Sequence, residues 1–201
     1  MTVIGITGPS GAGKGKASEI LKSKYGFSII DADNVYHSLV SKPSDCLDEI
    51  KLEFGDSVID AHGALDRASL RKLVFGEENR ERLLLLNSIT HKHVVNEIKN
   101  IISSLADTVS VCVIDAPLLI EAGLCSVCDF TIAVIANKNI RAQRISCRDS
   151  ISIDDAMLRI SSQKEDEYYI QNTCHFVKNN GDEKYLTSSL YKILSERRVL
   201  L

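Results

Sequence analysis

The residues whose types and spacing most clearly predict chemistry form a glycine-rich loop near the start of the chain. The loop reads Gly8-Pro-Ser-Gly-Ala-Gly-Lys-Gly15 and directly follows the apolar, β-branched run 2–7. Glycines let the backbone turn sharply and aim successive N–H groups inward as a nest for phosphate oxygens. A helix that begins there adds the positive end of its dipole, and Lys14 can reach the β- and γ-phosphates. The pattern predicts a P-loop that binds a nucleoside triphosphate.

The loop departs from the general P-loop pattern after its lysine. That pattern has Ser or Thr next, where the hydroxyl binds Mg²⁺, whereas this chain has Gly15 and then Lys16. The sequence Gly-Lys-Gly resembles the loops of nucleoside monophosphate kinases, cytidylate kinases in particular. Phosphate binding is therefore predicted, while two interpretations of Lys16 stay open: a second phosphate contact, or an ammonium group in water.

Three aspartates lie at the ends of predicted strands: Asp31 and Asp33 at the end of one, and Asp115 at the end of another. Ligands of parallel α/β sheets bind beyond the carboxyl ends of the strands, so we expect these carboxylates near the loop. One of the first two should cap the next helix, and Asp33 is the candidate base for an attacking hydroxyl. Asp115 is the candidate Mg²⁺-associated acid, with a turn residue before Pro117 as the alternative.

Three arginines, Arg141, Arg144 and Arg148, are spaced so that they share one helix face. One interpretation is a solvated basic face. The other is a lid helix that closes over the triphosphate and neutralises charge in the transition state.

The elements that must position these residues are short Val- and Ile-rich segments separated by helical patterns. This alternation predicts an α/β fold with a parallel sheet covered by helices on both faces. Strands are expected at 2–7, 27–31, 109–115, 130–135 and about 174–178. Helices are expected from the loop to about Lys24, at 34–41, within 43–105, at 141–148, 152–163 and about 182–198.

The composition predicts a single domain over residues 1–201, with 44% hydrophobic residues for its core. The net charge of −3, without a basic tail, argues against nucleic acid as a partner. No segment approaches the ~20 apolar residues of a membrane span, and a strand at residue 2 leaves no room for a signal peptide. Cys125 and Cys128 lack the second cysteine pair of a zinc site. We therefore expect a cytoplasmic protein with reduced thiols.

Longer motifs resemble the dephospho-CoA kinase family from residue 3 to about 190. They are Ile30-Asp-Ala-Asp33 with Val35-Tyr-His37-Ser-Leu39; Leu65-Asp-Arg67-x-x-Leu70-Arg71-x-x-Val74-Phe75; Asp115-x-Pro117-Leu118-Leu119-x-Glu121-x-Gly123-Leu124; Gln143-Arg144 with Arg148-Asp149; Arg159-Ile-x-x-Gln163; and Val177-x-Asn179-x-Gly181. The resemblance implies a P-loop kinase fold with a helical acceptor-binding insertion at about 34–106 and a helical lid at about 138–172.

The resemblance also implies an activity, the ATP-dependent phosphorylation of the ribose 3′-hydroxyl of dephospho-CoA, with Mg²⁺ as cofactor. Asp33, Lys14, Arg144 and Arg148 would be catalytic. ATP would be bound by Gly8, Gly11, Ala12, Gly13, Lys14, Gly15, Lys16 and Asn179. The acceptor would be bound by Asp31, His37, Arg67, Arg71, His91, Pro117 and Leu118, and Asp115 would hold Mg²⁺, directly or through water.

Two alternatives remain open from the sequence. One is a nucleoside monophosphate kinase, and the other is a nucleotide-binding homologue that has lost catalysis, as the missing loop hydroxyl at Gly15 suggests. The chain also has Lys92 after His91 where the family often has proline. We expect ATP and dephospho-CoA as small-molecule partners, no membrane, and a monomer or weak homo-oligomer.

Overall fold

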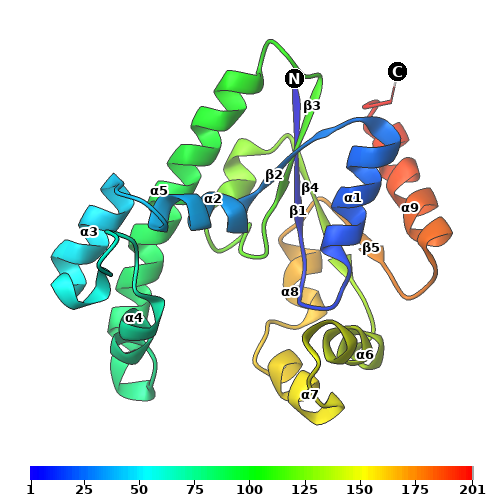
Figure 1. Ribbon diagram of the computed structural model, residues 1–201. Coiled ribbons are helices and arrows are strands. Elements are labelled where there is room, and N and C mark those ends of the chain that lie inside the picture. The colour runs from blue at the N-terminus through cyan, green and yellow to red at the C-terminus, as the bar shows by residue number, and fades with distance from the viewer. Residues whose placement is uncertain (201) are drawn as a thin grey trace. The chain divides into compact units, whose positions relative to one another are not determined.

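The five predicted strands form one sheet in the computed structural model, which describes residues 1–200 (Figure 1). The strand order is β2-β3-β1-β4-β5, and the strands run parallel. The strands are β1 (Thr2–Thr7), β2 (Ser28–Asp31), β3 (Val111–Asp115), β4 (Phe130–Ile135) and β5 (His175–Lys178). The predicted α/β class and five-stranded parallel sheet are confirmed.

The central strand, β1, positions the glycine loop. Every residue of β4 and all but Thr2 of β1 are buried, as expected for strands covered on both faces. Ile6 of β1 pairs with Asp115 of β3 and with Ile132 of β4, so the three strands end at one edge of the sheet. The loop leaves β1 at that edge, and the sheet therefore brings it near Asp115.

The chain divides into two compact units. The first comprises Met1–Ile30 and Ser104–Leu201 and carries the sheet, and the second comprises Asp31–Ser103 and is helical. The acceptor-binding role of 34–106 and the lid at 138–172 stay predictions.

In the first unit, side chains of β1, β3 and β4 form a core with α1 and α9, and further helices complete the unit. They are α1 (Lys14–Tyr25), the 3₁₀ turn η3 (Leu124–Val127), α6 (Lys138–Asp149), α7 (Ile153–Ser161), α8 (Asp166–Gln171) and α9 (Glu183–Glu196). Helix α1 ends where predicted, because Gly26 adopts φ 69° and its N–H donates to Lys22 O at 3.1 Å. Helix α8 was not predicted, since its six residues are too short for a helical period to be recognised.

The second unit has its own core, built from α2, α3, α4 and the N-terminal half of α5. Its helices are α2 (Ala32–Val40), α3 (Asp45–Phe54), η1 (Asp56–Val58), α4 (Arg67–Val74), η2 (Glu77–Asn79) and α5 (Arg80–Leu105). Helix α2 begins two residues before the predicted 34–41 because Asp31 caps it. Beyond the named strands, an isolated bridge joins Ile59 and Leu65.

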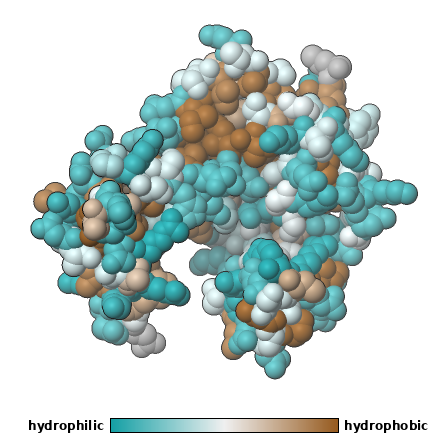
Figure 2. All heavy atoms as spheres, viewed as in Figure 1, coloured by the Kyte–Doolittle hydropathy of each residue, from teal (hydrophilic) through white to brown (hydrophobic). Residues whose placement is uncertain are grey.

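The surface is polar over most of the face that Figure 2 displays, with its largest hydrophobic patch near the top of the view and smaller ones below. Within residues 1–200, no helix has both the length and the apolar character needed to cross a membrane.

Candidate active site

The glycine loop has the backbone that a phosphate nest requires. Gly11 and Gly13 have φ of 76° and 100°, the left-handed region that favours glycine. A Cβ atom on Gly11 would lie 2.7 Å from Arg141 O, and one on Gly13 would lie 2.2 Å from Asn179 Nδ2. Helix α1 then begins at Lys14 without a side-chain cap and without an acidic residue in its first turn. The positive end of α1 is therefore left for an anionic ligand.

The loop carbonyls are bound from outside by two arginines of α6. Arg141 Nε donates to Ser10 O at 2.9 Å, and Arg144 Nη1 lies 3.3 Å from both Gly11 O and Ala12 O. A loop whose amides face a phosphate must turn carbonyls away from it, and buried carbonyls need donors. The two guanidinium groups supply those donors.

A third donor to the loop comes from the segment after β5. Asn179 is 5% exposed, and its Nδ2 donates to Ala12 O at 2.8 Å. The next residue, Asn180, accepts a hydrogen bond from Asn137 N at 2.8 Å and donates one to Asn137 Oδ1 at 3.2 Å. These bonds tie the segments after β4 and β5 together beside the loop.

Arg141 is the deepest of the three predicted arginines, at 1% exposed. Besides Ser10 O it binds Gln163 Oε1 at 2.7 Å, and that oxygen also accepts from Ser10 N at 3.1 Å. Asp166 Oδ1 lies 3.7 Å from Arg141 Nη1. Burial lowers the pKa of Arg141 and raises the pKa of Asp166. For Arg141 the solvated-face interpretation is wrong, because this side chain is a buried anchor of the loop.

Arg148 lies at the outer end of the same helix face and is more than half exposed. It donates to both carboxylate oxygens of Asp149, at 2.7 and 2.9 Å, and its Nη2 is 3.5 Å from Ser10 Oγ. Arg159 of α7 also contacts Asp149. The hydrogen bonds from Arg148, and then those from Arg159, hold the pKa of Asp149 at about 2. The arginine-bearing face of α6 therefore runs from the buried Arg141 to the exposed Arg148.

Asp115 has a partner that the sequence did not indicate. Ser18 Oγ, on α1, donates to Asp115 Oδ2 at 2.6 Å, and Ser18 is 6% exposed. Asp115 is half-buried at the end of β3, and Thr7 Oγ1 donates to Pro117 O at 3.1 Å in the segment that follows. Leu118, the neighbouring acceptor candidate, is 50% exposed.

Lys16 faces carboxylates. Its Nζ lies 3.1 Å from Glu19 of the same helix and 3.0 Å from Glu183 at the start of α9. Hydrogen bonds to Glu183 and then to Glu19 raise the pKa of Lys16. The ammonium group is thus engaged in two surface ion pairs between α1 and α9.

In the helical unit, Asp31 and Asp33 have different positions on α2. Asp31 is the N-cap, with Oδ1 accepting from Asn34 N at 3.0 Å, and Asp33 is exposed in the first turn. His37, one turn after Asp33, contacts Arg67 through Nδ1. The expectation that one aspartate caps the helix is confirmed, and the cap is Asp31.

The other acceptor candidates of this unit lie on α4 and α5. Asp66 caps α4 by accepting from Ala68 N at 3.0 Å and from Ser69 N at 3.1 Å, which places Arg67 at the first helical position. The guanidinium of Arg71 lies 5.0 Å from the centre of the Phe75 ring. His91 is half-buried on α5.

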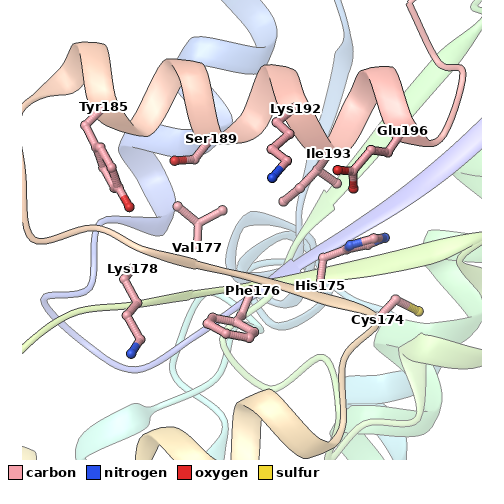
Figure 3. A pocket seen from close by; sticks show the side chains of 10 residues that line it. All are labelled: Cys174, His175, Phe176, Val177, Lys178, Tyr185, Ser189, Lys192, Ile193 and Glu196. Atoms are coloured by element: carbon pink, nitrogen blue, oxygen red, sulfur yellow. The ribbon is translucent and has the colours of Figure 1, made fainter.

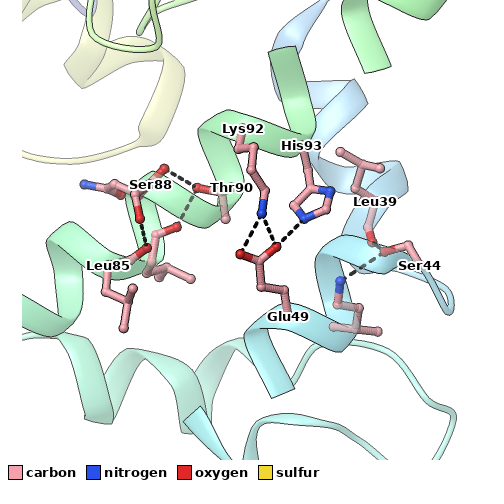
Figure 4. A network of polar contacts seen from close by, with 11 residues as sticks. Leu39, Ser44, Glu49, Leu85, Ser88, Thr90, Lys92 and His93 are labelled. Carbon is pink, nitrogen blue, oxygen red and sulfur yellow. Dashed lines mark hydrogen bonds and ion pairs between the residues drawn. The ribbon is translucent and has the colours of Figure 1, made fainter. Parts of the chain in front are cut away.

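Lys92, which departs from the family pattern, belongs to a polar network (Figure 4). Its Nζ lies 2.7 Å from Glu49 Oε1, and His93 Nε2 lies 2.7 Å from Glu49 Oε2. The hydrogen bonds from Lys92 and then from His93 lower the pKa of Glu49. Lys92, which stands where the family often has proline, therefore helps to hold α5 against α3.

A cavity of about 490 Å³ lies elsewhere, between the edge strand β5 and helix α9 (Figure 3). Lys178 and Val177 of β5 and Tyr185 and Lys192 of α9 are among the residues that line it. None of its lining residues is a predicted site residue, so it is distinct from the loop.

Comparison with known proteins decides the family. A model of the dephospho-CoA kinase family matches residues 2–184. The chain belongs to this family. A dephospho-CoA kinase from Carboxydothermus hydrogenoformans is 34% identical over 197 residues, which cover 98% of this chain and 94% of the relative.

Solved structures share the fold of this dephospho-CoA kinase family member. The crystal structure of TT1252 from Thermus thermophilus is 27% identical, with a TM-score of 0.78 and 97% of each chain covered. The dephospho-CoA kinase from Campylobacter jejuni is 24% identical, with a TM-score of 0.69 and 96% of each chain covered. The predicted family and the predicted P-loop kinase fold are confirmed.

Sequence reasoning missed residues of this kinase-family chain that hold Asp115 and the segments around the glycine loop in place. Ser18, Asn180 and Asn137 carry no motif, and their partners are far away in sequence. Gln163 was noted only through the family resemblance, and its bond to the loop amide of Ser10 had no local signal.

Proposed function

We propose that this chain transfers the γ-phosphoryl group of ATP to the ribose 3′-hydroxyl of dephospho-CoA, giving ADP and CoA in the last step of CoA synthesis. The observation that carries the proposal is the match of the dephospho-CoA kinase family over residues 2–184, which includes the loop and the acceptor motifs. The phosphate nest, with its carbonyls held outward, supports the triphosphate half of the reaction.

The proposed ATP site is the inner face of the loop and the start of α1. Backbone amides of the loop other than Ser10 N and Ala12 N, which are bonded within the protein, would bind phosphate oxygens, and Lys14 would neutralise their charge. Asn179 would act beside them, with its amide nitrogen on Ala12 O. Lys16, which the sequence also assigned here, is engaged by Glu19 and Glu183 and would contribute least.

Asp33 is the proposed catalytic base. It would accept the proton of the 3′-hydroxyl as that oxygen attacks the γ-phosphorus, while the bond to the β–γ bridging oxygen breaks and ADP leaves. Asp33 lies exposed in the first turn of α2, where the helix dipole makes an acidic side chain favourable.

Arg144 and Arg148 are proposed to stabilise the charge of the transferring phosphoryl group. In the hydrogen bonds described above, Arg144 uses only Nη1 on the loop carbonyls, although a guanidinium has five N–H donors. Donors aimed at charge that develops in the transition state lower the barrier more than they strengthen ground-state binding. Arg148 is paired with Asp149, so on closure of the proposed lid its guanidinium would bind both Asp149 and the phosphate.

A magnesium ion fits the donor set of the first unit. Mg²⁺ is usually held by one or two carboxylates together with nucleotide phosphates and water. Asp115 offers such a carboxylate, and its Oδ1 is not used by the bond from Ser18. In residues 1–200 no cluster of three or more His, Cys, Asp or Glu side chains could hold a metal by itself. When bound, the ion would neutralise charge on the β- and γ-phosphates.

The acceptor is proposed to be bound mainly by side chains of the helical unit. The candidates are Asp31, His37, Arg67, Arg71 and His91 of that unit, with Pro117 and Leu118 of the first. Arginine and histidine suit the anionic groups of a phosphorylated acceptor. The six cysteines are free, which suits the reducing cytoplasm that we propose as the location.

A coupled assay tests the proposal directly. Purified protein with ATP and Mg²⁺ should release ADP rapidly with dephospho-CoA and only slowly with CMP or AMP. Faster turnover of CMP would instead support a nucleoside monophosphate kinase, which the loop sequence resembles. Tight ATP binding without turnover of any acceptor would show that the chain is a nucleotide-binding homologue.

A further inference from the structure

The hydrogen bond between Ser18 and Asp115 links the phosphate-binding helix to the end of β3. Ser18 Oγ donates to Asp115 Oδ2 at 2.6 Å across 97 residues of sequence. A hydroxyl donating to a carboxylate at this distance is a strong, charge-assisted bond. Ser18 is almost buried, so little water competes for the carboxylate oxygen it binds.

We infer that Ser18 is a positioning residue, whose hydroxyl on α1 orients the Asp115 carboxylate toward Mg²⁺ in a chain whose loop has no hydroxyl at Gly15. The inference rests on the proposed function, because it assigns Ser18 a part in the response of nucleotide binding to Mg²⁺. By occupying Oδ2, Ser18 restricts rotation of the carboxylate and leaves Oδ1 for the cation or its water shell.

The helix geometry explains why this role is indirect. Ser18 follows Lys14 by four residues and Gly15 by three, so all three lie on one side of α1. It is one turn farther from the loop, about 5.4 Å along the axis. A hydroxyl at this height does not take the place of the missing loop hydroxyl. It acts on the cation through the carboxylate.

The loop has room for the hydroxyl that it lacks. A Cβ atom on Gly15 would meet nothing within 4 Å, and Gly15 is not among the glycines with positive φ. A serine can therefore be introduced there without strain. Gly15→Ser offers a way to restore a loop hydroxyl in a chain from which the Ser18 hydroxyl has been removed.

The test is calorimetric binding of ATP with and without Mg²⁺, in the absence of any acceptor. Ser18→Ala should leave the Kd for ATP without Mg²⁺ within about twofold of wild type, while the gain in affinity on adding Mg²⁺ should fall about tenfold, the worth of one bond to a charged group. Asp115→Asn should lose at least as much, and Ser18→Ala/Asp115→Asn no more than Asp115→Asn alone. The double variant Gly15→Ser with Ser18→Ala should recover part of the Mg²⁺-dependent gain in ATP affinity that Ser18→Ala alone loses.

Ser146→Ala is the matched control. It removes another helical serine hydroxyl, bonded to Ile151 O at 2.7 Å, from the same unit, and it should leave the gain from Mg²⁺ unchanged. The inference is overturned if Ser18→Ala lowers the melting temperature without changing that gain, or if the two losses add in the double variant. Because no acceptor is present, a protein that shows the expected coupling but never phosphorylates dephospho-CoA would refute the proposed function alone.

Discussion

The two units of this kinase-family chain support their polar residues in different ways. In the first unit the loop is bound by side chains from distant sequence, with a sequence separation of 131 for Ser10 and Arg141 and of 167 for Ala12 and Asn179. In the helical unit the aspartates act locally, since Asp31 binds the amide three residues later and Asp66 binds amides two and three residues later.

This difference teaches that the loop of the first unit is preorganised, whereas the polar residues of the helical unit are held less tightly. Buried, multiply bonded donors hold the loop in one shape before ATP arrives, which lowers the cost of ordering it. Within the described residues, the exposed pair His37–Arg67 and the Arg71–Phe75 contact are not surrounded by buried side-chain donors like those of the loop. We expect changes around the loop to affect stability and ATP binding together, and changes in the helical unit to affect turnover while the fold is kept.

The largest effect is expected for Asp33→Asn. Removing the base should lower kcat by about 10²-fold or more, the usual worth of a positioned base, with the melting temperature and the Kd for ATP unchanged. Asp31→Asn is the matched control for the helix cap, because asparagine caps a helix as well as aspartate does. Since Asp31 is an acceptor-binding candidate, this variant should change the KM for the acceptor more than kcat. Steady-state kinetics and thermal unfolding measure both. Equal losses in the two variants would remove the distinction between base and cap.

Arg141→Met should have the largest effect on stability. It deletes a buried guanidinium with bonds to Ser10 O and Gln163, so the free energy of unfolding should fall by roughly 2 kcal/mol and ATP binding should weaken. Lys138→Met, on the same helix, removes an exposed ion pair with Glu165 and should cost less than about 0.5 kcal/mol. Denaturant unfolding of both variants tests this, and similar costs would contradict the buried-anchor assignment.

Arg144→Ala should have an intermediate effect, and it should lower turnover more than ATP affinity. We expect kcat to fall roughly tenfold, about 1.4 kcal/mol, because the lost donor serves the transferring phosphoryl group. The Kd for ATP should change by less, since Asn179 still binds Ala12 O. Kinetics and equilibrium binding on the same preparation separate the two quantities. If both quantities worsen equally, Arg144 only holds the loop.

The smallest effect is expected for Lys16→Met. Its two carboxylate partners lie at the surface, and exposed ion pairs contribute about 0–1 kcal/mol. The Kd for ATP should stay within about twofold of wild type at moderate ionic strength. A tenfold loss of ATP affinity in a calorimetric titration would instead support the interpretation of Lys16 as a second phosphate contact.

Much of the first unit could be predicted from sequence because its signals are local. The strands 2–7 and 130–135 were predicted with their observed bounds, since short β-branched runs between turns have few alternatives. The six-residue helix α8 was missed, because it has too few residues for a period and is stabilised by packing against β4 and β5. In the helical unit, the choice between Asp31 and Asp33 as the cap depended on backbone angles that the sequence leaves open.

The sequence by itself determined the glycine loop, the parallel α/β sheet and the kinase family. Each of these depends on patterns along the chain: glycines that permit positive φ, alternating element types, and motifs in a fixed order. Only the tertiary structure decided that Arg141 is buried while Arg148 is exposed, and that Ser18 binds Asp115. Burial and long-range hydrogen bonds arise when distant segments pack together, so residue type and spacing along one helix do not specify them.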